Sequence, residues 1–158
     1  MDDPFEKLKN AKKNIHIADH MLTQTYPLVK DSKLLIAVLD NIFLAMRNAM
    51  DSLLASEREA KTIPPFHDSF DAKLNLLKLR LAAKHSIDNK QVLLMQDLKS
   101  MIARHKESPM EFIRKDKFVI CSEEYDLTSI SVDQMKSFIK QAKAFVDKIE
   151  SVIGGTDE

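Results

Sequence analysis

Residues 31–61 have the sequence DSKLLIAVLDNIFLAMRNAMDSLLASEREAK. Their apolar side chains recur at spacings of three and four, which is the period of an amphipathic helix. Asp31 or Ser32 supplies the N-cap of this helix. Ile36, Phe43 and Leu54 widen its apolar stripe on one side, and so broad a face predicts a central helix in a bundle. The main stripe consists of Leu35, Val38, Leu39, Ile42, Met46, Ala49, Met50 and Leu53.

A helix is also expected before this stretch, over residues 4–25. Pro4 stands behind two aspartates at a first-turn position, where its missing N–H costs nothing. Pro27 is expected to end the helix, because proline removes a hydrogen-bond donor and clashes with the preceding turn.

Three further helices are expected after the Pro64–Pro65 break. Polar caps open the first two, and Ser131 with Gln134 forms a capping box for the last. Residues 110–130, between the last two helices, are expected to be irregular apart from a short extended piece at 117–121. The expected helix ranges are 68–84, 88–107 and 131–153. The pattern therefore predicts an all-α fold, an antiparallel bundle of about five helices forming one domain over residues 1–153, with a disordered tail at 154–158.

Glycine and charge exclude several classes of protein. The chain has two glycines among 158 residues, Gly154 and Gly155, so residues 1–153 contain none. Phosphate loops and dinucleotide folds need glycine where the backbone approaches the ligand, so we expect no nucleotide cofactor, and we predict no other cofactor. Lys plus Arg and Asp plus Glu number 24 each, which argues against holding nucleic acid by bulk charge.

The cellular compartment is indicated by cysteine usage and hydropathy. Cys121 is the only cysteine, so no intrachain disulfide can form and a reducing compartment is expected. The first ten residues lack an apolar core, and no apolar run approaches the ~20 residues of a membrane span. We predict a cytoplasmic protein without a signal peptide or membrane partner.

Two histidines one helical turn apart raise the question of a metal site. His16 and His20, with Asp19 between them, share a helix face in a geometry that can chelate a divalent ion. Such a site needs further ligands from another helix, and the other histidines form no matching pair. We therefore predict no metal site and interpret the pair as surface histidines.

Arg80 and His85 form an R-x4-H motif in the sequence RLAAKH. Here the chain resembles the HEPN superfamily of small helical bundles, whose active members are metal-independent RNases. The resemblance implies that Arg80 would steady a phosphate and His85 would act in general acid–base cleavage. On an ideal helix the two side chains lie about 140° apart, so both reach one substrate only if the helix breaks there.

A basic segment follows the fourth helix. His105 falls on the apolar face of that helix and Arg104 on the opposite face, while two phenylalanines interleave with the cations. Such a segment is typical of a phosphate- or RNA-facing patch, and equally of a solvated loop whose aromatic rings close the end of the bundle. The stretch HKESPMEFIRKDKFVICSEEY also resembles a segment of small uncharacterised archaeal proteins. The candidate binding residues are Arg104, His105, Lys106, Arg114, Lys115 and Lys117.

Ile17 and Met21 lie well off the main stripe of the first helix, which suggests either packing between two neighbouring helices or a homodimer contact. Glu57 and Glu59 are interpreted as solvated surface charges.

Because the sequence shows no complete set of catalytic residues, the leading prediction is a non-enzymatic interaction module that binds a protein or RNA partner. The alternative is a toxin-like HEPN RNase acting through Arg80 and His85.

Overall fold

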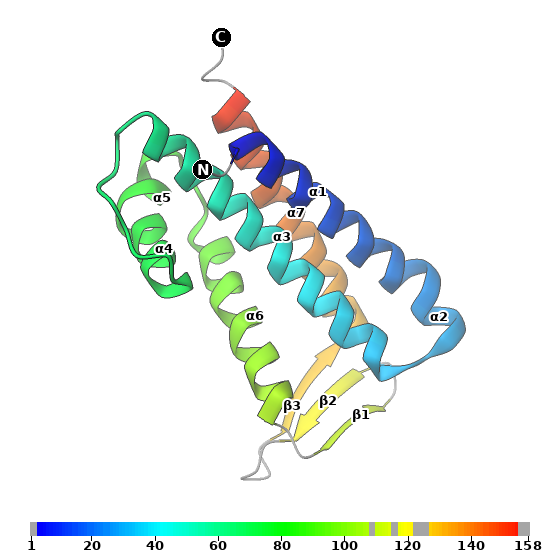
Figure 1. Cartoon of the computed structure of the whole chain (residues 1–158). Coiled ribbons are helices and arrows are strands. Elements are labelled where there is room, and N and C mark those ends of the chain that lie inside the picture. The colour runs from blue at the N-terminus through cyan, green and yellow to red at the C-terminus, as the bar shows by residue number, and fades with distance from the viewer. Residues whose placement is uncertain (1–2, 108–109, 115–116, 122–126, 155–158) are drawn as a thin grey trace.

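The computed structural model describes residues 3–107, 110–114, 117–121 and 127–154. Within these ranges the chain is mostly helical, and five helices pack together, some of them interrupted by a short π-helical turn (Figure 1). The helical bundle expected from the sequence is confirmed. No described helix is both long enough and apolar enough to cross a membrane.

Helix α3 (Ser32–Glu59) is the central helix of the bundle. It begins where expected, because the Asp31 carboxylate accepts a hydrogen bond of 2.9 Å from the Lys33 N–H. The main apolar stripe is buried together with Leu54, while Ile36 and Phe43 are half-buried against the core. Helix α3 packs against the first, third, fourth and last helices of the bundle.

The first helix is longer than predicted. It comprises α1 (Pro4–His20), the π-helical turn η1 (Met21–Thr25) and α2 (Tyr26–Val29). In η1 the Tyr26 N–H donates to the Met21 carbonyl, five residues back. The wider turn shifts the hydrogen-bond pattern just before Pro27, so the helix continues past a proline that lacks its own donor. The prediction that Pro27 ends the helix is therefore wrong.

The third helix is built from α4 (Phe70–Leu76), the π-helical turn η2 (Leu77–Leu81) and α5 (Ala82–Lys84). The fourth is α6 (Asn89–Glu107). Both begin at the expected polar caps, since the Ser69 hydroxyl accepts from the Ala72 N–H and the Asp88 carboxylate from the Lys90 N–H.

Among the described residues, three that follow helix ends have left-handed backbone conformations: Lys30 (φ 56°), Lys61 (φ 58°) and Ser86 (φ 56°). Glycine usually occupies such positions because it has no Cβ to clash with the backbone. A chain without glycine before residue 154 therefore turns at three positions where side-chain-bearing residues carry some strain.

The segment before the last helix forms an antiparallel sheet instead of an irregular loop. Strands β1 (Met110–Arg114), β2 (Lys117–Cys121) and β3 (Leu127–Ser131) lie in the order β1-β2-β3. The extended piece expected at 117–121 is confirmed as the central strand. The sheet closes the end of the bundle away from the start of α1, and Phe118, Ile120 and Ile130 are buried in the core (Figure 1).

Helix α7 (Val132–Gly154) follows β3 directly. The predicted capping box is confirmed: the Ser131 N–H donates to Gln134 Oε1 at 2.8 Å, and the Gln134 N–H donates to Ser131 Oγ at 3.0 Å. Gly154 still belongs to α7, so it is not part of a tail. Residues 155–158 of the predicted tail lie outside the described residues.

Candidate functional site

Helices α1 and α7 pack side by side and run in opposite directions, and a groove lies between them. Lys12 pairs with Glu150 near one end, and Thr23 and Asp133 line the other. The hollow has a volume of about 870 Å³. Buried side chains of Ile15 and Val146 help to line it. We call this hollow the α1–α7 groove.

Charged side chains of both signs dominate the α1–α7 groove. In the described part of the chain, four lysines and four carboxylates line it, with His16 beside them. Most of these side chains are exposed, so they are available to a ligand. The lysines are Lys12, Lys136, Lys140 and Lys143, and the acids are Asp19, Asp133, Asp147 and Glu150.

A second hollow of about 520 Å³ continues the groove toward the sheet. It shares Thr23, Asp133 and Lys136 with the α1–α7 groove, and Lys30 and Lys117 also line it. Of the predicted binding residues whose side chains the structure describes, Lys117 alone lines either hollow.

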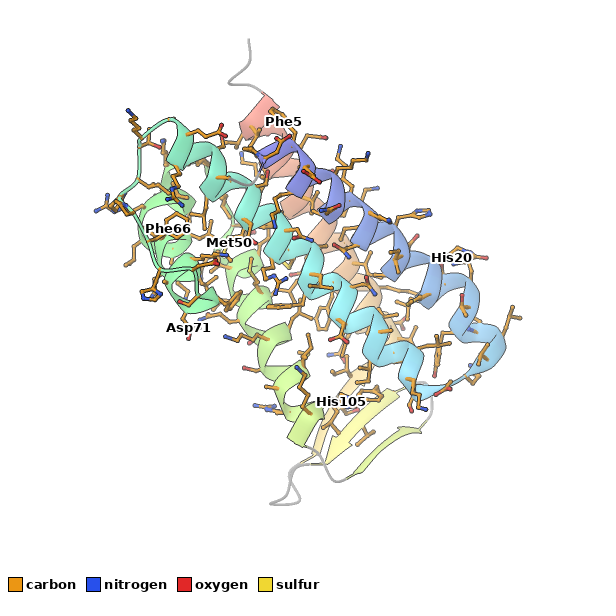
Figure 2. All side chains as sticks on the ribbon, in the orientation of Figure 1. Phe5, His20, Met50, Phe66, Asp71 and His105 are labelled. Carbon is orange, nitrogen blue, oxygen red and sulfur yellow. The ribbon has the colours of Figure 1, made fainter. Side chains whose placement is uncertain are left out.

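The two histidines of α1 lie beside the groove. His16 lines the groove, and its ring centroid is 6.5 Å from that of His20. His20 points outward from α1 (Figure 2). Among the described residues, no group of three His, Cys, Asp or Glu side chains is placed to hold a metal ion.

The structure gives Arg80 and His85 different surroundings. Arg80 is exposed on η2. His85 lies just after α5 with its side chain 15% exposed, and its Nε2 is 2.5 Å from Glu57 Oε1 on α3. The imidazole is thus held by a carboxylate of the bundle.

Glu57 has a role that the sequence did not reveal. The prediction that it is a solvated surface charge is wrong. Its side chain is only 8% exposed, and Thr62, Lys84 and His85 are all hydrogen-bonded to its carboxylate. Burial alone would raise the pKa of Glu57, but these hydrogen bonds and the charge of Lys84 outweigh it and lower the pKa below its ordinary value. The cluster joins the loop after α3 and the end of α5 to α3. Glu59, in contrast, is exposed as expected.

Three of the predicted binding residues, Arg104, His105 and Lys106, lie at the sheet end of α6. Arg104 and Lys106 are exposed there, whereas His105 is half-buried with its ring 6.3 Å from that of Phe118 (Figure 2). Burial raises the pKa of Asp40 on α3, and electrostatic interactions with the neighbouring His105 and Lys106 side chains offset only part of that rise. The expected position of His105 on the apolar face is confirmed.

The other members of that basic segment are more dispersed. Arg114 is the last residue of β1, and Lys117 is exposed at the start of β2, where its Cα is paired with that of Arg114. Lys115 lies outside the described residues. Of the two residues suggested for a homodimer contact, Ile17 is half-buried, and Met21 is partly buried against the core of its own chain.

The groove lysines of α7 were not singled out from the sequence. Lys136, Lys140 and Lys143 recur at spacings of four and three, so they form one stripe on the helix. This spacing indicates that the three lysines share one face of the helix, but it does not indicate which neighbouring helix lies beside that face. Neither protein-family models nor curated proteins give a significant match to this sequence.

Proposed function

We propose that this chain is a non-enzymatic interaction module that binds a segment of a protein partner in the α1–α7 groove. The observation that carries the proposal is the lining of the groove, in which charges of both signs surround buried apolar side chains. Such a lining gives a ligand both a hydrophobic contact and a charge pattern that fixes its position.

The balance of charges favours protein over RNA as the ligand. A nucleic acid presents phosphates of one sign, and the four carboxylates of the groove would repel them. A protein segment can match lysines with acidic side chains and carboxylates with basic ones. Along α1 and η1 the groove runs from Lys12 to Thr23, about 16 Å at 1.5 Å per residue. That length corresponds to about five residues of extended chain.

The alternative, an RNase acting through Arg80 and His85, receives less support. The His85 imidazole is engaged by a buried carboxylate, and Arg80 is exposed on the preceding π-helical turn. A general acid–base histidine needs a nitrogen available to the reacting proton, together with a phosphate-binding group that converges on the same substrate. The resemblance to the HEPN superfamily stays a prediction that rests on the motif.

The test is affinity purification of the tagged chain from the cells that naturally express it, followed by mass spectrometry and light scattering with absorbance at 260 and 280 nm. The compared proteins are the parent chain, Lys140→Glu in the groove, and Lys90→Glu on α6, which contributes no residue to the groove. We expect a protein that the parent and Lys90→Glu retain and Lys140→Glu loses. The chain has no Trp and two Tyr, so bound RNA would dominate the ultraviolet signal.

Three results would contradict the proposal. They are co-purifying RNA without protein, a protein lost equally from both variants, and a bare monomer. A second copy of the chain counts as the partner only if the Lys140→Glu variant turns the dimer into a monomer while Lys90→Glu leaves it intact.

A further inference from the structure

The loop between α3 and α4 presents two consecutive prolines to solvent. Pro64 and Pro65 are both exposed, whereas Ile63 before them and Phe66 after them are half-buried and pack against the hydrophobic core. The loop leads from the end of α3 to the start of α4 (Figure 1), and none of its residues lines the α1–α7 groove. We call residues 63–66 the proline ridge.

Contacts with α3 hold the proline ridge in place on both sides. Before the ridge, the Thr62 N–H and the Thr62 hydroxyl both donate to the Glu57 carbonyl, at 3.0 and 2.9 Å. At its other end, the guanidinium carbon of Arg58 lies 5.8 Å from the centroid of the Phe66 ring, which is within the range of a cation–π contact. A segment that is already ordered in this way loses little conformational entropy when it binds a partner.

The sequence of the ridge restricts its backbone to an extended shape. Proline fixes its own φ at about −65°, and it also disfavours the helical region for the residue that precedes it. Pro64 is subject to both effects, because Pro65 follows it, so its backbone is confined to the polyproline II region. Ile63 is kept extended by Pro64 in the same way. In agreement, residues 64–67 belong to no helix, strand or turn.

The hydrogen-bonding groups of the ridge limit what can bind it. Pro64 and Pro65 have no backbone N–H, so these two positions offer carbonyl acceptors and no donor. The ridge therefore cannot add a regular strand to a β-sheet, whose ladder takes both groups from each strand. Its sequence, IPPF, carries no charge. A partner must recognise it by apolar contact and by donating hydrogen bonds, and the rings of Trp and Tyr supply both.

We propose that the proline ridge is a second binding site of this chain, which docks into an aromatic-lined groove of a partner protein that recognises polyproline II segments. In such a groove the rings of Pro64 and Pro65 pack between aromatic side chains, and indole or phenol groups donate to the carbonyls of the ridge. This inference goes beyond the proposed function, because the ridge contributes nothing to the α1–α7 groove.

The experiment is site-specific photocrosslinking in an extract of the cells that naturally express the chain. A photoreactive phenylalanine analogue replaces the exposed His67, just after the ridge, in three purified chains: the parent, the double variant Pro64→Ala/Pro65→Ala, and Pro27→Ala. Pro27 is the matched control, because it is also exposed but lies in helix α2. Crosslinking of the parent is repeated with an excess of deca-L-proline or of a Gly-Ser peptide of equal length.

We expect one protein adduct from position 67, attached to a peptide of the partner that contains Trp or Tyr. Pro27→Ala should give the same yield as the parent, and the double variant should reduce the yield about tenfold. Deca-L-proline should suppress the adduct, and the Gly-Ser peptide should not. Because this competition uses the parent chain, its result does not depend on how the double variant folds.

The inference would be overturned by the absence of a protein adduct at position 67, by an adduct that deca-L-proline leaves unchanged, or by equal yields from the double variant and Pro27→Ala. The inference and the proposed function fail separately. Lys140→Glu alters the α1–α7 groove and leaves the ridge intact, whereas the double variant does the reverse.

Discussion

Replacing Glu57 by Ala tests the polar contact that joins the end of α5 to α3. The substitution removes a carboxylate that is 8% exposed and leaves the imidazole of His85, which is 15% exposed, without its partner. Each hydrogen bond to a buried charged group contributes about 1.5–3 kcal/mol. The Lys84 side chain is 47% exposed and is hydrated again once released, so its share is at most about 0.5 kcal/mol. Thr62 also donates to the Glu57 carbonyl, a bond that survives the substitution. We expect a loss of about 2–4 kcal/mol of unfolding free energy.

The assay is urea unfolding at neutral pH, followed by far-ultraviolet circular dichroism. With a slope of about 2 kcal/mol per molar urea, the midpoint should fall by about 1–2 M. Glu59→Ala is the matched control, because Glu59 is two residues away on the same helix and exposed. It should change stability by no more than about 0.5 kcal/mol. Equal midpoints for the two variants would refute the reasoning.

The difference in stability between the parent chain and Glu57→Ala should also depend on pH, in a direction that the pKa of Glu57 fixes. The pKa of Glu57 is lowered from its ordinary value of 4.5 in the folded chain, so its carboxylate stabilises the fold above pH 4.5. That contribution is lost as the pH falls through the folded pKa. The difference in stability between the parent and Glu57→Ala should therefore be full at pH 7 and shrink on acidification below pH 4.5. A difference that grows in acid would contradict this assignment.

Three further predictions concern other parts of the chain. Lys61→Gly should raise stability by about 0.5–1 kcal/mol because it relieves a left-handed side-chain-bearing residue, and a melting temperature about 2–4 °C higher for a gain of 1 kcal/mol would confirm it. Ser131→Ala should cost about 1 kcal/mol in urea unfolding because it removes the acceptor for the Gln134 N–H, and an unchanged midpoint would show that the capping box is unimportant. His85→Ala and Arg80→Ala should degrade a labelled RNA no differently from the parent chain, and loss of a parental RNase activity in either variant would favour the alternative function.

The sequence predicted the helices well because their signals are local. The stripe of α3, the Asp31 cap and the Ser131–Gln134 capping box all lie within a few residues of the structures they specify. The sheet was only partly predicted, since its strands pair through hydrogen bonds between segments that carry no glycine turn signal. The prediction that Pro27 ends the first helix was wrong because the π-helical turn that accommodates this proline has no local signature in the sequence.

The site was harder to predict because it forms between helices far apart in the chain. Nothing around Glu57 indicates that Lys84 and His85 will reach it, and Glu59 has the same residue type two positions later. The stripe of lysines on α7 is visible in the sequence, but its place beside α1 depends on how the bundle packs. Lys117 was chosen for its basic neighbours, while the other described residues that line its hollow come from η1, α2 and the residue after it, β3 and α7.

Site-specific photocrosslinking in the cells that naturally express the chain tests the groove most directly. A photoreactive phenylalanine analogue placed at Lys140 should attach to one partner protein, and the same analogue at the exposed Lys90 of α6 should not. A covalent adduct of defined mass from position 140 alone is the expected result. Adducts from both positions, or RNA as the crosslinked species, would contradict a protein-binding groove between α1 and α7.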